Sequence, residues 1–558
     1  MKDLIVSILR DAIERARAAG KLTAATPSIG IEAPRDPAHG DVASNVALTL
    51  ARAERKPPRA IAEIVKSHLA MPAEVSEVSV AGPGFINFKM SPAYWQGEMR
   101  GAASQGRAFW KPRAWELRPG AGKRVQVEFL SANPTGPLTV GHGRNAVLGD
   151  TIARLYEAAG FDVTREYYFN DGGRQMKLLG ESVRVRYLQE HGIDAALPEE
   201  GYQGEYILAI ARALKAERGD ALVSVTELEI FRAAAVKAIF ADINQTCARL
   251  GIRFDVYTNE LDLISAGLVD AVLEALRERG LTVERDGATW LRADKLGLQK
   301  DAVLVRSGPD RQPTYRTPDI AYHIEKLKRG FDVIVDVLGA DHIAEFQQVV
   351  AAVKALGHDT TPIHAIIYQF VTLTRGGEKV KMSTRKATYV TLDELIDEVG
   401  ADVVRFFFLF RKSDSQLDFD LELAKRQAPE NPVFYVQYAH ARLASIFREG
   451  AARGLTLPAD RSAVDLNLLG AEELDLAKRA VGLPDVMSAA AEALEPHRIP
   501  FYLLELAGDF HRYYNKPTSR IIGPDRELSL ARMFMAAILK DAIAGGLELL
   551  GVSAPERM

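Results

Sequence analysis

The chain has 558 residues, which is too long for one hydrophobic core, so its length predicts three or four domains. Apolar residues make up 47% and charged residues 26%, a composition that excludes a disordered or fibrous protein and is typical of a soluble globular one. The formal net charge of -4 excludes a uniformly basic surface, so a nucleic-acid-binding surface would have to be a local patch.

Two further properties bear on location. No run of about 18 uncharged apolar residues occurs, so we expect no membrane-spanning helix. The single cysteine, Cys247, has no partner for an intramolecular disulfide and no companions for a zinc site. We therefore expect a cytoplasmic protein without a protein-bound metal cluster.

Residues 1–110 are predicted to form a small α/β module. The apolar residues of its first segment have the spacing of an amphipathic helix; they are Leu4, Ile5, Ile8, Leu9 and Ile13. Around residues 75–90, β-branched residues flank a Gly-Pro-Gly turn, which predicts short strands.

Residues 120–400 show a β/α rhythm. A strand at 124–130, a Pro/Gly-rich loop, a helix starting near Gly143 and a strand at 161–169 predict a right-handed crossover in a parallel sheet. The stretch 172–300 is mostly helical and charged, and strands are expected again at 331–339 and 364–373. We therefore predict a parallel-sheet nucleotide-binding domain that is split by an insertion.

Residues 401–558 are predicted to be almost entirely helical. Successive apolar patterns of helical period indicate a C-terminal all-α helical bundle.

The first candidate for chemistry is the turn at Gly141 and His142. A helix begins here, and the free N–H groups and positive dipole of a helix N-terminus suit a phosphate. Glycine lets a nucleotide approach the backbone closely, and His142 can donate to a phosphoryl oxygen. The same two residues are also typical of an ordinary helix cap.

The second candidate is a basic loop that follows a Gly-Gly turn. It contains Lys379, Lys381, Arg385 and Lys386 around Ser383 and Thr384. Cations on such a loop can stabilise the charge that develops on a phosphoryl group during transfer. A solvated surface loop is the alternative.

The two segments together resemble class I aminoacyl-tRNA synthetases. "TVGH" at Thr139–His142 is similar to the HIGH signature of that class, and "KMSTR" at Lys381–Arg385 is similar to its KMSKS signature. Longer strings, among them "SANPTGPLTVGHGRNAVLGD", "REYYFNDGGRQM", "TYRTPDIAYH" and "LLGVSAPERM", resemble arginyl-tRNA synthetases specifically. This resemblance extends from about residue 30 to the last residue.

The resemblance implies a Rossmann-like, HUP-type catalytic domain, an N-terminal tRNA-contacting domain and a helical anticodon-binding domain. It also implies that L-arginine and ATP with Mg2+ form arginyl-adenylate, and that arginine then passes to the 3'-terminal adenosine of tRNA(Arg). His142 and Lys381 are the implied catalytic residues. The implied ATP-binding residues are Thr139, Gly141, His142, Gly339, Asp341, His342, Lys381, Met382 and Ser383.

Both signatures depart from the family pattern. Thr139 replaces the first histidine of HIGH, and its hydroxyl can donate a hydrogen bond but cannot carry a positive charge. The second lysine of KMSKS is absent, and either Arg385 or Lys386 is a possible substitute.

Arginine has to be recognised by acceptors, because its guanidinium presents only N–H donors. If the segment "TYRTPD" begins a helix, Tyr315 and Asp319 lie on one side of it and can clamp the guanidinium, with Pro318 in the first turn and Thr317 as a possible N-cap. For the α-amino and carboxylate groups the resemblance indicates Glu128, Ser131 and Asn133, and Glu260 is a further candidate in the same pocket.

The tRNA-contacting residues are predicted from two regions of the chain. Phe85 and Asn87, in "GFINF", resemble an edge of the family's N-terminal domain, although a packed strand is an alternative explanation for this string. The C-terminal candidates combine aromatic and basic side chains with the last residue of the chain, and about half of the aromatic residues here are expected in the core. They are Tyr435, Tyr438, Arg442, Arg512, Tyr514 and Met558.

The sequence leaves two alternatives to an arginine ligase that acts as a monomer. A related class I synthetase for another amino acid would keep both signatures but would lack a carboxylate suited to guanidinium. A catalytically inactive RNA-binding paralogue is the other, and Thr139 is the residue that favours it. The resemblance also implies that arginine activation requires bound tRNA.

Overall fold

The computed structural model describes residues 1–32, 34, 36, 39–110, 121–309, 311–380 and 390–558. These residues form two compact units. Unit 1 consists of Met1–Gly106, Leu457–Val481 and Pro524–Ile538, and unit 2 consists of Arg107–Thr456, Gly482–Gly523 and Leu539–Met558. Because each unit combines separate stretches of chain, the domain boundaries at 110, 120 and 400 stay a prediction.

Unit 1 contains a four-stranded antiparallel sheet of order β1-β2-β4-β3. Its strands are β1 Ile31–Glu32, β2 Val42–Ser44, β3 Val75–Ala81 and β4 Phe85–Met90. Its helices are α1 Lys2–Ala18, α2 Val46–Glu54, α3 Pro58–Ser67, α4 Pro92–Gln105 and α19 Ala471–Val481. The apolar positions predicted for the first helix hold, because Ile5, Leu9 and Ile13 are fully buried.

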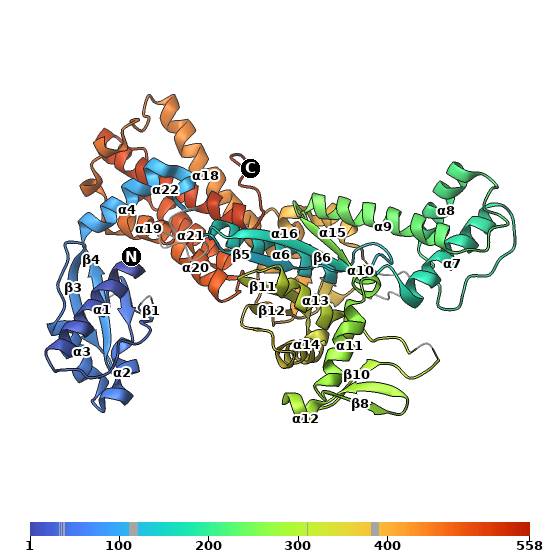
Figure 1. The fold of residues 1–558 in the computed structure, drawn as a ribbon. Coiled ribbons are helices and arrows are strands. Elements are labelled where there is room, and N and C mark those ends of the chain that lie inside the picture. The colour runs from blue at the N-terminus through green and yellow to red at the C-terminus, as the bar shows by residue number, and fades with distance from the viewer. Residues whose placement is uncertain (33, 35, 37–38, 111–120, 310, 381–389) are drawn as a thin grey trace. The chain divides into compact units, whose positions relative to one another are not determined.

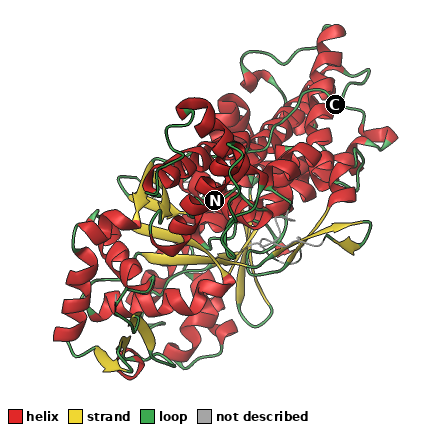
Figure 2. Ribbon diagram, turned by 90° about the vertical axis from the view of Figure 1, so that its right-hand side faces the viewer, coloured by secondary structure: helices red, strands yellow, loops and turns green. Residues whose placement is uncertain are grey.

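Unit 2 is built on a five-stranded sheet of order β12-β11-β5-β6-β7, in which every pair is parallel (Figure 1). Its strands are β5 Arg124–Glu128, β6 Asp162–Phe169, β7 Val256–Asn259, β11 Val333–Gly339 and β12 Ile363–Tyr368. The parallel nucleotide-binding sheet predicted from the sequence is therefore confirmed. Figure 2 shows these strands with helices on both sides.

The segments between the strands include several helices. The predicted crossover helix is α6 Val140–Ala158, which connects β5 to β6. The stretch 172–300 contains helices, as expected, and also β7, which joins the main sheet. The other helices up to β12 are α7 Gly173–Glu190, α8 Glu205–Arg218, α9 Glu229–Arg249, α10 Glu260–Ser265, α11 Leu268–Glu278, α12 Ala293–Leu296, α13 Arg316–Lys328 and α14 Ile343–Ala355.

Two smaller sheets complete unit 2. One is antiparallel and contains β8 Thr282–Arg285, β9 Ala288–Leu291 and β10 Ala302–Val305. The other contains β13 Val371–Arg375, β14 Glu378–Lys379 and β15 Leu417–Asp420. The single strand predicted at 364–373 is in fact two strands, β12 and β13, which belong to different sheets.

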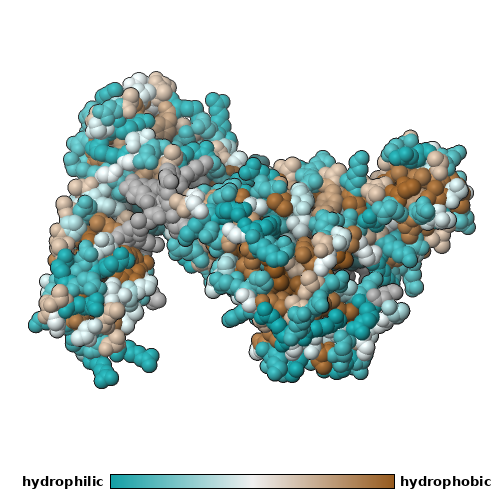
Figure 3. Space-filling model, in the orientation of Figure 1, coloured by the Kyte–Doolittle hydropathy of each residue, from teal (hydrophilic) through white to brown (hydrophobic). Residues whose placement is uncertain are grey.

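The chain after residue 400 is largely helical, as predicted. The helices here are α16 Ala401–Leu409, α17 Leu421–Lys425, α18 Pro432–Ala452, α20 Leu483–Glu492, α21 Arg498–Tyr514 and α22 Arg526–Leu549, together with α19, and α15 Leu392–Val399 comes just before them. No helix among the described residues is long and apolar enough to cross a membrane. On the face drawn in Figure 3, hydrophobic residues occur in patches between hydrophilic ones.

The two faces of the main sheet differ in polarity around β5. On one face α6 packs closely, since a Cβ atom at Gly149 would lie 2.2 Å from Cβ of Phe129. On the other face Glu128 accepts a hydrogen bond from Lys326 of α13. Buried parallel strands are normally apolar on both faces, so the polar face toward α13 indicates a functional site.

Candidate active site

The carboxyl ends of the parallel strands lie at one edge of the sheet. Because β5 lies between β11 and β6, the chain segments that follow these three strands are neighbours. The strand order reverses between β11 and β5, and α6 starts at this edge after β5. Such a topological switch point is where open α/β sheets bind ligands. Of the predicted residues, Glu128 and Gly339 end the strands β5 and β11, Glu260 directly follows β7, and Gly141 lies in the first turn of the helix after β5.

The N-terminus of α6 is capped by the first signature. The helix begins at Val140, three residues earlier than predicted, with Thr139 as its N-cap. The backbone N–H of Thr139 donates to Nδ1 of His142 at 3.2 Å, and burial lowers the pKa of His142. The ring is then neutral with its proton on Nε2, so His142 keeps one outward N–H donor.

Gly141 borders open space in this turn. A Cβ atom at Gly141 would meet only Oγ1 of Thr139, at 3.8 Å. Packing within the protein therefore does not require glycine here. Gly143 is different, because a Cβ atom there would lie 2.6 Å from Leu392 of α15.

The segment after β5 has a strained backbone. Leu130 and Ser131 have φ angles of 67° and 44°, which lie in the left-handed region that non-glycine residues rarely adopt. Asn145 of α6 accepts a hydrogen bond from the N–H of Leu130 at 2.6 Å, and Ser131 Oγ donates to Glu128 Oε1 at 3.0 Å. These contacts hold the end of β5 in a defined position.

Asp319 lies at the start of α13 and faces a pocket. The pocket is lined by Glu128, Asp319, Tyr322, His323, Asp336, Leu338, His342, Glu345, Phe346 and Val349. Burial raises the pKa of Asp319 to about 7, and the negative charges of Glu345, Glu128 and Glu260 add to this effect while His323 opposes it. This carboxyl group therefore lacks a cationic partner strong enough to hold it ionised, which suits a site that takes a cationic ligand.

The helix predicted at Tyr315 and Asp319 is confirmed, but its cap is not the predicted residue. The N-cap of α13 is Tyr315, and the N–H of Asp319 donates to the carbonyl of Tyr315 at 3.1 Å. Thr317 is buried, and its hydroxyl donates to the carbonyl of Leu304 at 2.9 Å. The side chain of Tyr315 is 61% exposed and is free to close over a ligand.

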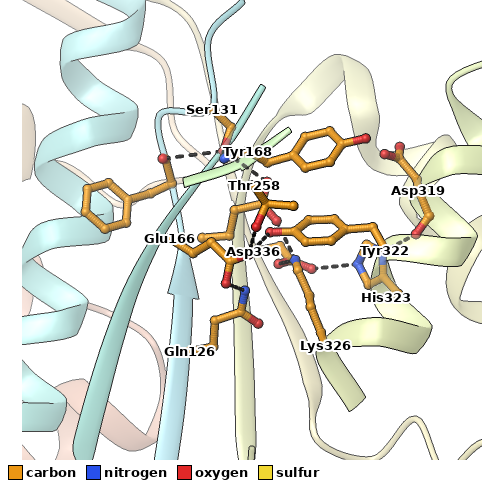
Figure 4. Close-up of polar contacts among 12 residues, drawn as sticks. Gln126, Ser131, Glu166, Tyr168, Thr258, Asp319, Tyr322, His323, Lys326 and Asp336 are labelled. Carbon is orange, nitrogen blue, oxygen red and sulfur yellow. Dashed lines mark hydrogen bonds and ion pairs between the residues drawn. The ribbon is translucent and has the colours of Figure 1, made fainter. Parts of the chain in front are cut away.

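Beneath the pocket lies a buried polar cluster that the sequence did not lead us to expect (Figure 4). Lys326 of α13 is fully buried and donates to Glu128 Oε2 and, at 2.6 Å, to Asp336 Oδ1. His323 contacts Asp336 Oδ2 through Nε2 at 2.9 Å and the carbonyl of Asp319 through Nδ1 at 2.7 Å. An imidazolium ring can donate to both acceptors at once.

A second group of buried contacts converges on Glu166 of β6, which is fully buried. Its carboxylate accepts hydrogen bonds from Gln126, Thr258, Tyr322 and Arg329, at 2.5 to 3.1 Å. Burial opposes the charge on Glu166, but these donors and Lys326 lower its pKa. Both oxygens of the Glu166 carboxylate thus accept hydrogen bonds within the protein, and these bonds fix the position of Tyr322 next to the pocket.

Glu260, at the start of α10, does not line the pocket and is engaged by neighbouring side chains. It accepts hydrogen bonds from the hydroxyl of Tyr168 at 3.0 Å and from Asn170 at 2.6 Å, and burial raises its pKa. The Tyr168 ring stacks on Tyr322, with centroids 4.5 Å apart (Figure 4). Asn133 is exposed, and its Oδ1 accepts from the N–H of Asn170 at 2.9 Å.

The predicted residues after β11 form a 3-10 turn. Gly339 ends the strand, and the side chains of Asp341 and His342 are 62% and 56% exposed. A hydrogen bond with Glu345 raises the pKa of His342, and the charge of Asp341 adds to this effect. The three residues lie at the sheet edge and leave two polar side chains open to a ligand.

Lys381, Met382 and Ser383 of the second signature, with Arg385 and Lys386, lie outside the described residues. The chain after them contacts the first signature directly, since Thr391 forms an antiparallel bridge with Thr139. The N–H of Leu392 also donates to the carbonyl of Leu138 at 2.8 Å. The two signatures are therefore linked through the chain that follows the second.

Two of the C-terminal candidates, Tyr438 and Tyr514, contact a third, Arg442. Its guanidinium lies over the rings of Tyr438 and Tyr514, at 4.6 Å and 4.8 Å from their centroids. Tyr435 contacts the ring of His511 at 4.6 Å between centroids. Arg512 and Met558 are exposed.

In unit 1, Phe85 is partly exposed at the start of β4, whereas Asn87 is 3% exposed and Phe88 is fully buried. The alternative that Phe88 belongs to the core is thus confirmed. Tyr513, which adjoins the C-terminal candidates, is also a core residue, at 1% exposure.

Several residues around the site were missed, although the sequence carried a signal for them. Gln126, Glu166 and Asp336 are polar residues inside strands that are otherwise rich in valine, isoleucine and aromatic residues. A central parallel strand is normally apolar throughout. Such polar positions predict a buried network, but not which partners they find.

Comparisons with known proteins identify the family of each part of the chain. Residues 113–405 match the model of the tRNA synthetases class I (R), catalytic domain. Residues 3–90 match the arginyl tRNA synthetase N terminal domain, and residues 436–558 match the DALR anticodon binding domain.

Individual relatives match along nearly the whole chain. The arginine--tRNA ligase of Desulfotalea psychrophila is 47% identical over 563 residues, which covers 100% of this chain and 99% of the relative. That of Salinibacter ruber is 48% identical and covers 95% and 96%. The solved structure of Thermus thermophilus arginyl-tRNA synthetase is 25% identical, has a TM-score of 0.75 and covers 99% of both chains.

The matches span all three parts of the chain and include the catalytic domain that carries the sheet edge and both signatures. The chain therefore belongs to the arginyl-tRNA synthetases, a family of class I aminoacyl-tRNA synthetases.

Proposed function

We propose that this chain is an arginine--tRNA ligase. An oxygen of the arginine carboxylate attacks the α-phosphorus of ATP, which forms arginyl-adenylate and releases diphosphate. A hydroxyl of the 3'-terminal adenosine of tRNA(Arg) then attacks the acyl carbon and releases AMP. The observation that carries the proposal is the acidic pocket around Asp319. This pocket lies at the same edge of the sheet as the N-terminus of α6.

The side chain of arginine is held by Asp319 and Tyr315. Asp319 lines the pocket, and a guanidinium that binds there supplies the positive charge that its carboxylate lacks. The exposed ring of Tyr315 covers the planar group from the start of the same helix. Glu260 does not line the pocket, but it adds a second negative charge that acts on Asp319.

The backbone end of arginine is held at the end of β5. Glu128 lines the same pocket as Asp319 and binds the α-ammonium group. Ser131 and Asn133 follow on the strained segment and orient the carboxylate toward ATP. Strain at this position is consistent with a backbone that is shaped for a ligand.

ATP binds at the N-terminus of α6 and over the turn after β11. Gly141 lets the nucleotide approach the backbone, and the outward N–H of His142 stabilises the phosphates in the transition state. Thr139 adds its hydroxyl, and Gly339, Asp341 and His342 bind the nucleoside. Lys381, Met382 and Ser383 bind the phosphates, and Mg2+ enters bound to ATP.

tRNA binds to both units. The stacked group of Tyr438, Arg442 and Tyr514 offers flat surfaces and a positive charge to unpaired anticodon bases. Tyr435, Arg512 and Met558 extend this surface. In unit 1, Phe85 offers a partly exposed ring to tRNA. The side chain of Asn87 is buried, so it contributes less to tRNA binding than Phe85 does.

The test is attachment of arginine to purified tRNA with ATP and Mg2+. Charging of tRNA with arginine is expected, and no product would favour an inactive RNA-binding paralogue. Asp319→Ala should raise the KM for arginine sharply and leave that for ATP nearly unchanged. If Asp319→Ala charged tRNA with another amino acid as efficiently as the wild type does, the protein would instead be a related synthetase of different specificity.

We also propose that the protein acts as a monomer in the cytoplasm and that arginine activation needs bound tRNA. Light scattering at micromolar concentration tests the first point. Pyrophosphate exchange tests the second, since exchange at full rate without tRNA would contradict it.

A further inference from the structure

We propose that Lys326 is a positioning residue for the α-ammonium group of the substrate, because its ammonium pairs with the carboxylate of Glu128 and fixes the orientation of that carboxylate. The proposal rests on the arginine site described above. It gives a role in the reaction to a residue that carries neither signature and that does not itself line the pocket.

Lys326 is enclosed by groups from three elements of unit 2. Its ammonium donates to Glu128 on β5 and to Asp336 on β11, and it lies 4.2 Å from the centroid of the Tyr322 ring on α13. The side chain has no exposed surface. A buried ammonium is costly unless it is paired, and this one has two carboxylates and an aromatic face.

The charge of Lys326 is needed because Glu128 is buried. The pKa of Glu128 is raised, because burial and the charge of Asp336 outweigh the lowering effect of Lys326, and without Lys326 it would be higher still. Burial also opposes the charge on Lys326, but Asp336 and Glu128 raise its pKa. Without Lys326 the Glu128 carboxyl would take up a proton and lose its attraction for an ammonium group.

The orientation of Glu128 is fixed at both oxygens. Lys326 donates to Oε2, and Ser131 donates to Oε1 at 3.0 Å. Ser131 is itself held, because its Oγ accepts from the N–H of Tyr168 at 3.1 Å. Each carboxylate oxygen keeps a further lone pair, so Glu128 can still accept from a ligand in the pocket.

One helix thus serves both ends of the amino acid. Asp319 and Lys326 are seven residues apart on α13, which places them on one face about two turns apart. Asp319 offers its carboxyl to the guanidinium directly, and Lys326 acts on the other end through Glu128. The spacing of Asp319 and Lys326 along α13 therefore relates the position of the guanidinium to that of the α-ammonium group.

The test compares two ligands that differ only at the α-carbon. 5-Guanidinopentanoate has the guanidinium and the carboxylate of arginine but no α-ammonium group, and it is used as a competitive inhibitor of charging. Lys326→Met should raise the KM for arginine about tenfold or more. The inhibition constant of 5-guanidinopentanoate should stay within about twofold of the wild-type value.

The pH profile gives a second readout. In Lys326→Met the KM for arginine should fall more steeply with rising pH than in the wild type, since Glu128 now titrates as well. The groups around Glu128 that bear on this profile are Asp319, His323, Asp336, Glu345, Glu260 and Glu166. Lys326→Arg, which keeps the charge, should restore the wild-type slope.

Arg405→Met is the matched control, because it removes another buried cation of unit 2 from its pair with Asp150, outside the pocket. It should lower Tm without changing the KM for arginine relative to the inhibition constant of 5-guanidinopentanoate. Should Lys326→Met not fold, Lys326→Gln keeps one donor without the charge and should show the same selective loss.

The inference is overturned if the Lys326 variants weaken both ligands equally, or if they lower Tm and leave both affinities unchanged. Failure of the proposed function would look different, since the wild-type protein would then not charge tRNA with arginine at all.

Discussion

The backbone N–H of Thr139 donates a 3.2 Å hydrogen bond to Nδ1 of His142, so the residue that departs from the signature sets the tautomer of the one that is kept. The contact needs only the main chain of Thr139. The threonine at this position therefore does not by itself argue against catalysis.

This relationship predicts different results for two substitutions of His142. His142→Asn keeps an acceptor near Nδ1 but loses the Nε2–H donor, so kcat should fall about 100-fold to 1000-fold. His142→Gln keeps an outward N–H donor and loses the cap, so kcat should fall less while the protein becomes less stable. Charging rates and Tm of both variants test this, and equal kcat values would contradict it.

Arginine binding should depend on pH through Asp319. The pKa of this carboxyl is raised to about 7, and a guanidinium pairs with its ionised form, so binding should strengthen as pH rises through that value. From pH 8 to pH 6 the ionised fraction falls about tenfold, and the KM for arginine should rise by the same factor. Steady-state charging across this range is the measurement.

Asp319→Asn is the control for this pH dependence. It keeps the shape of the side chain but cannot ionise, so its KM for arginine should be high and nearly constant between pH 6 and 8. A pH dependence like that of the wild type in this variant would assign the titration to another group.

Two glycines of α6 should respond oppositely to alanine. A Cβ atom at Gly141 meets only Thr139 at 3.8 Å, so Gly141→Ala should fold normally but raise the KM for ATP, because the nucleotide needs that space. A Cβ atom at Gly149 would lie 2.2 Å from Phe129, so Gly149→Ala should destabilise the protein by about 1–3 kcal/mol.

Thermal unfolding and ATP kinetics of the two glycine variants separate packing from ligand approach. If Gly141→Ala left the KM for ATP unchanged, this turn would be an ordinary helix cap.

The stacked group around Arg442 should bind tRNA through its flat guanidinium. Arg442→Lys keeps the charge but cannot stack between Tyr438 and Tyr514, so the KM for tRNA should rise about tenfold. The KM for arginine in the same variant is the internal control and should not change. Charging at several tRNA concentrations provides both values.

The sequence by itself determined the family, the parallel sheet and a helix after the first strand, although that helix begins at Val140 and not near Gly143, because signatures, strand periodicity and turn residues are local patterns. It also pointed to Asp319 as a candidate, through the family resemblance and its position four residues after Tyr315, and its role as the guanidinium ligand stays a prediction.

Only the tertiary structure decided which charges meet. Lys326 is 198 residues from Glu128 along the chain. No local sequence pattern indicates that Lys326 pairs with both Glu128 and Asp336. Likewise β7 joins the main sheet although it lies in a stretch expected to be an insertion, and Asn87 is buried although it is polar. Burial and ion pairing depend on contacts between distant segments, which become definite only when the sheet and α13 pack together.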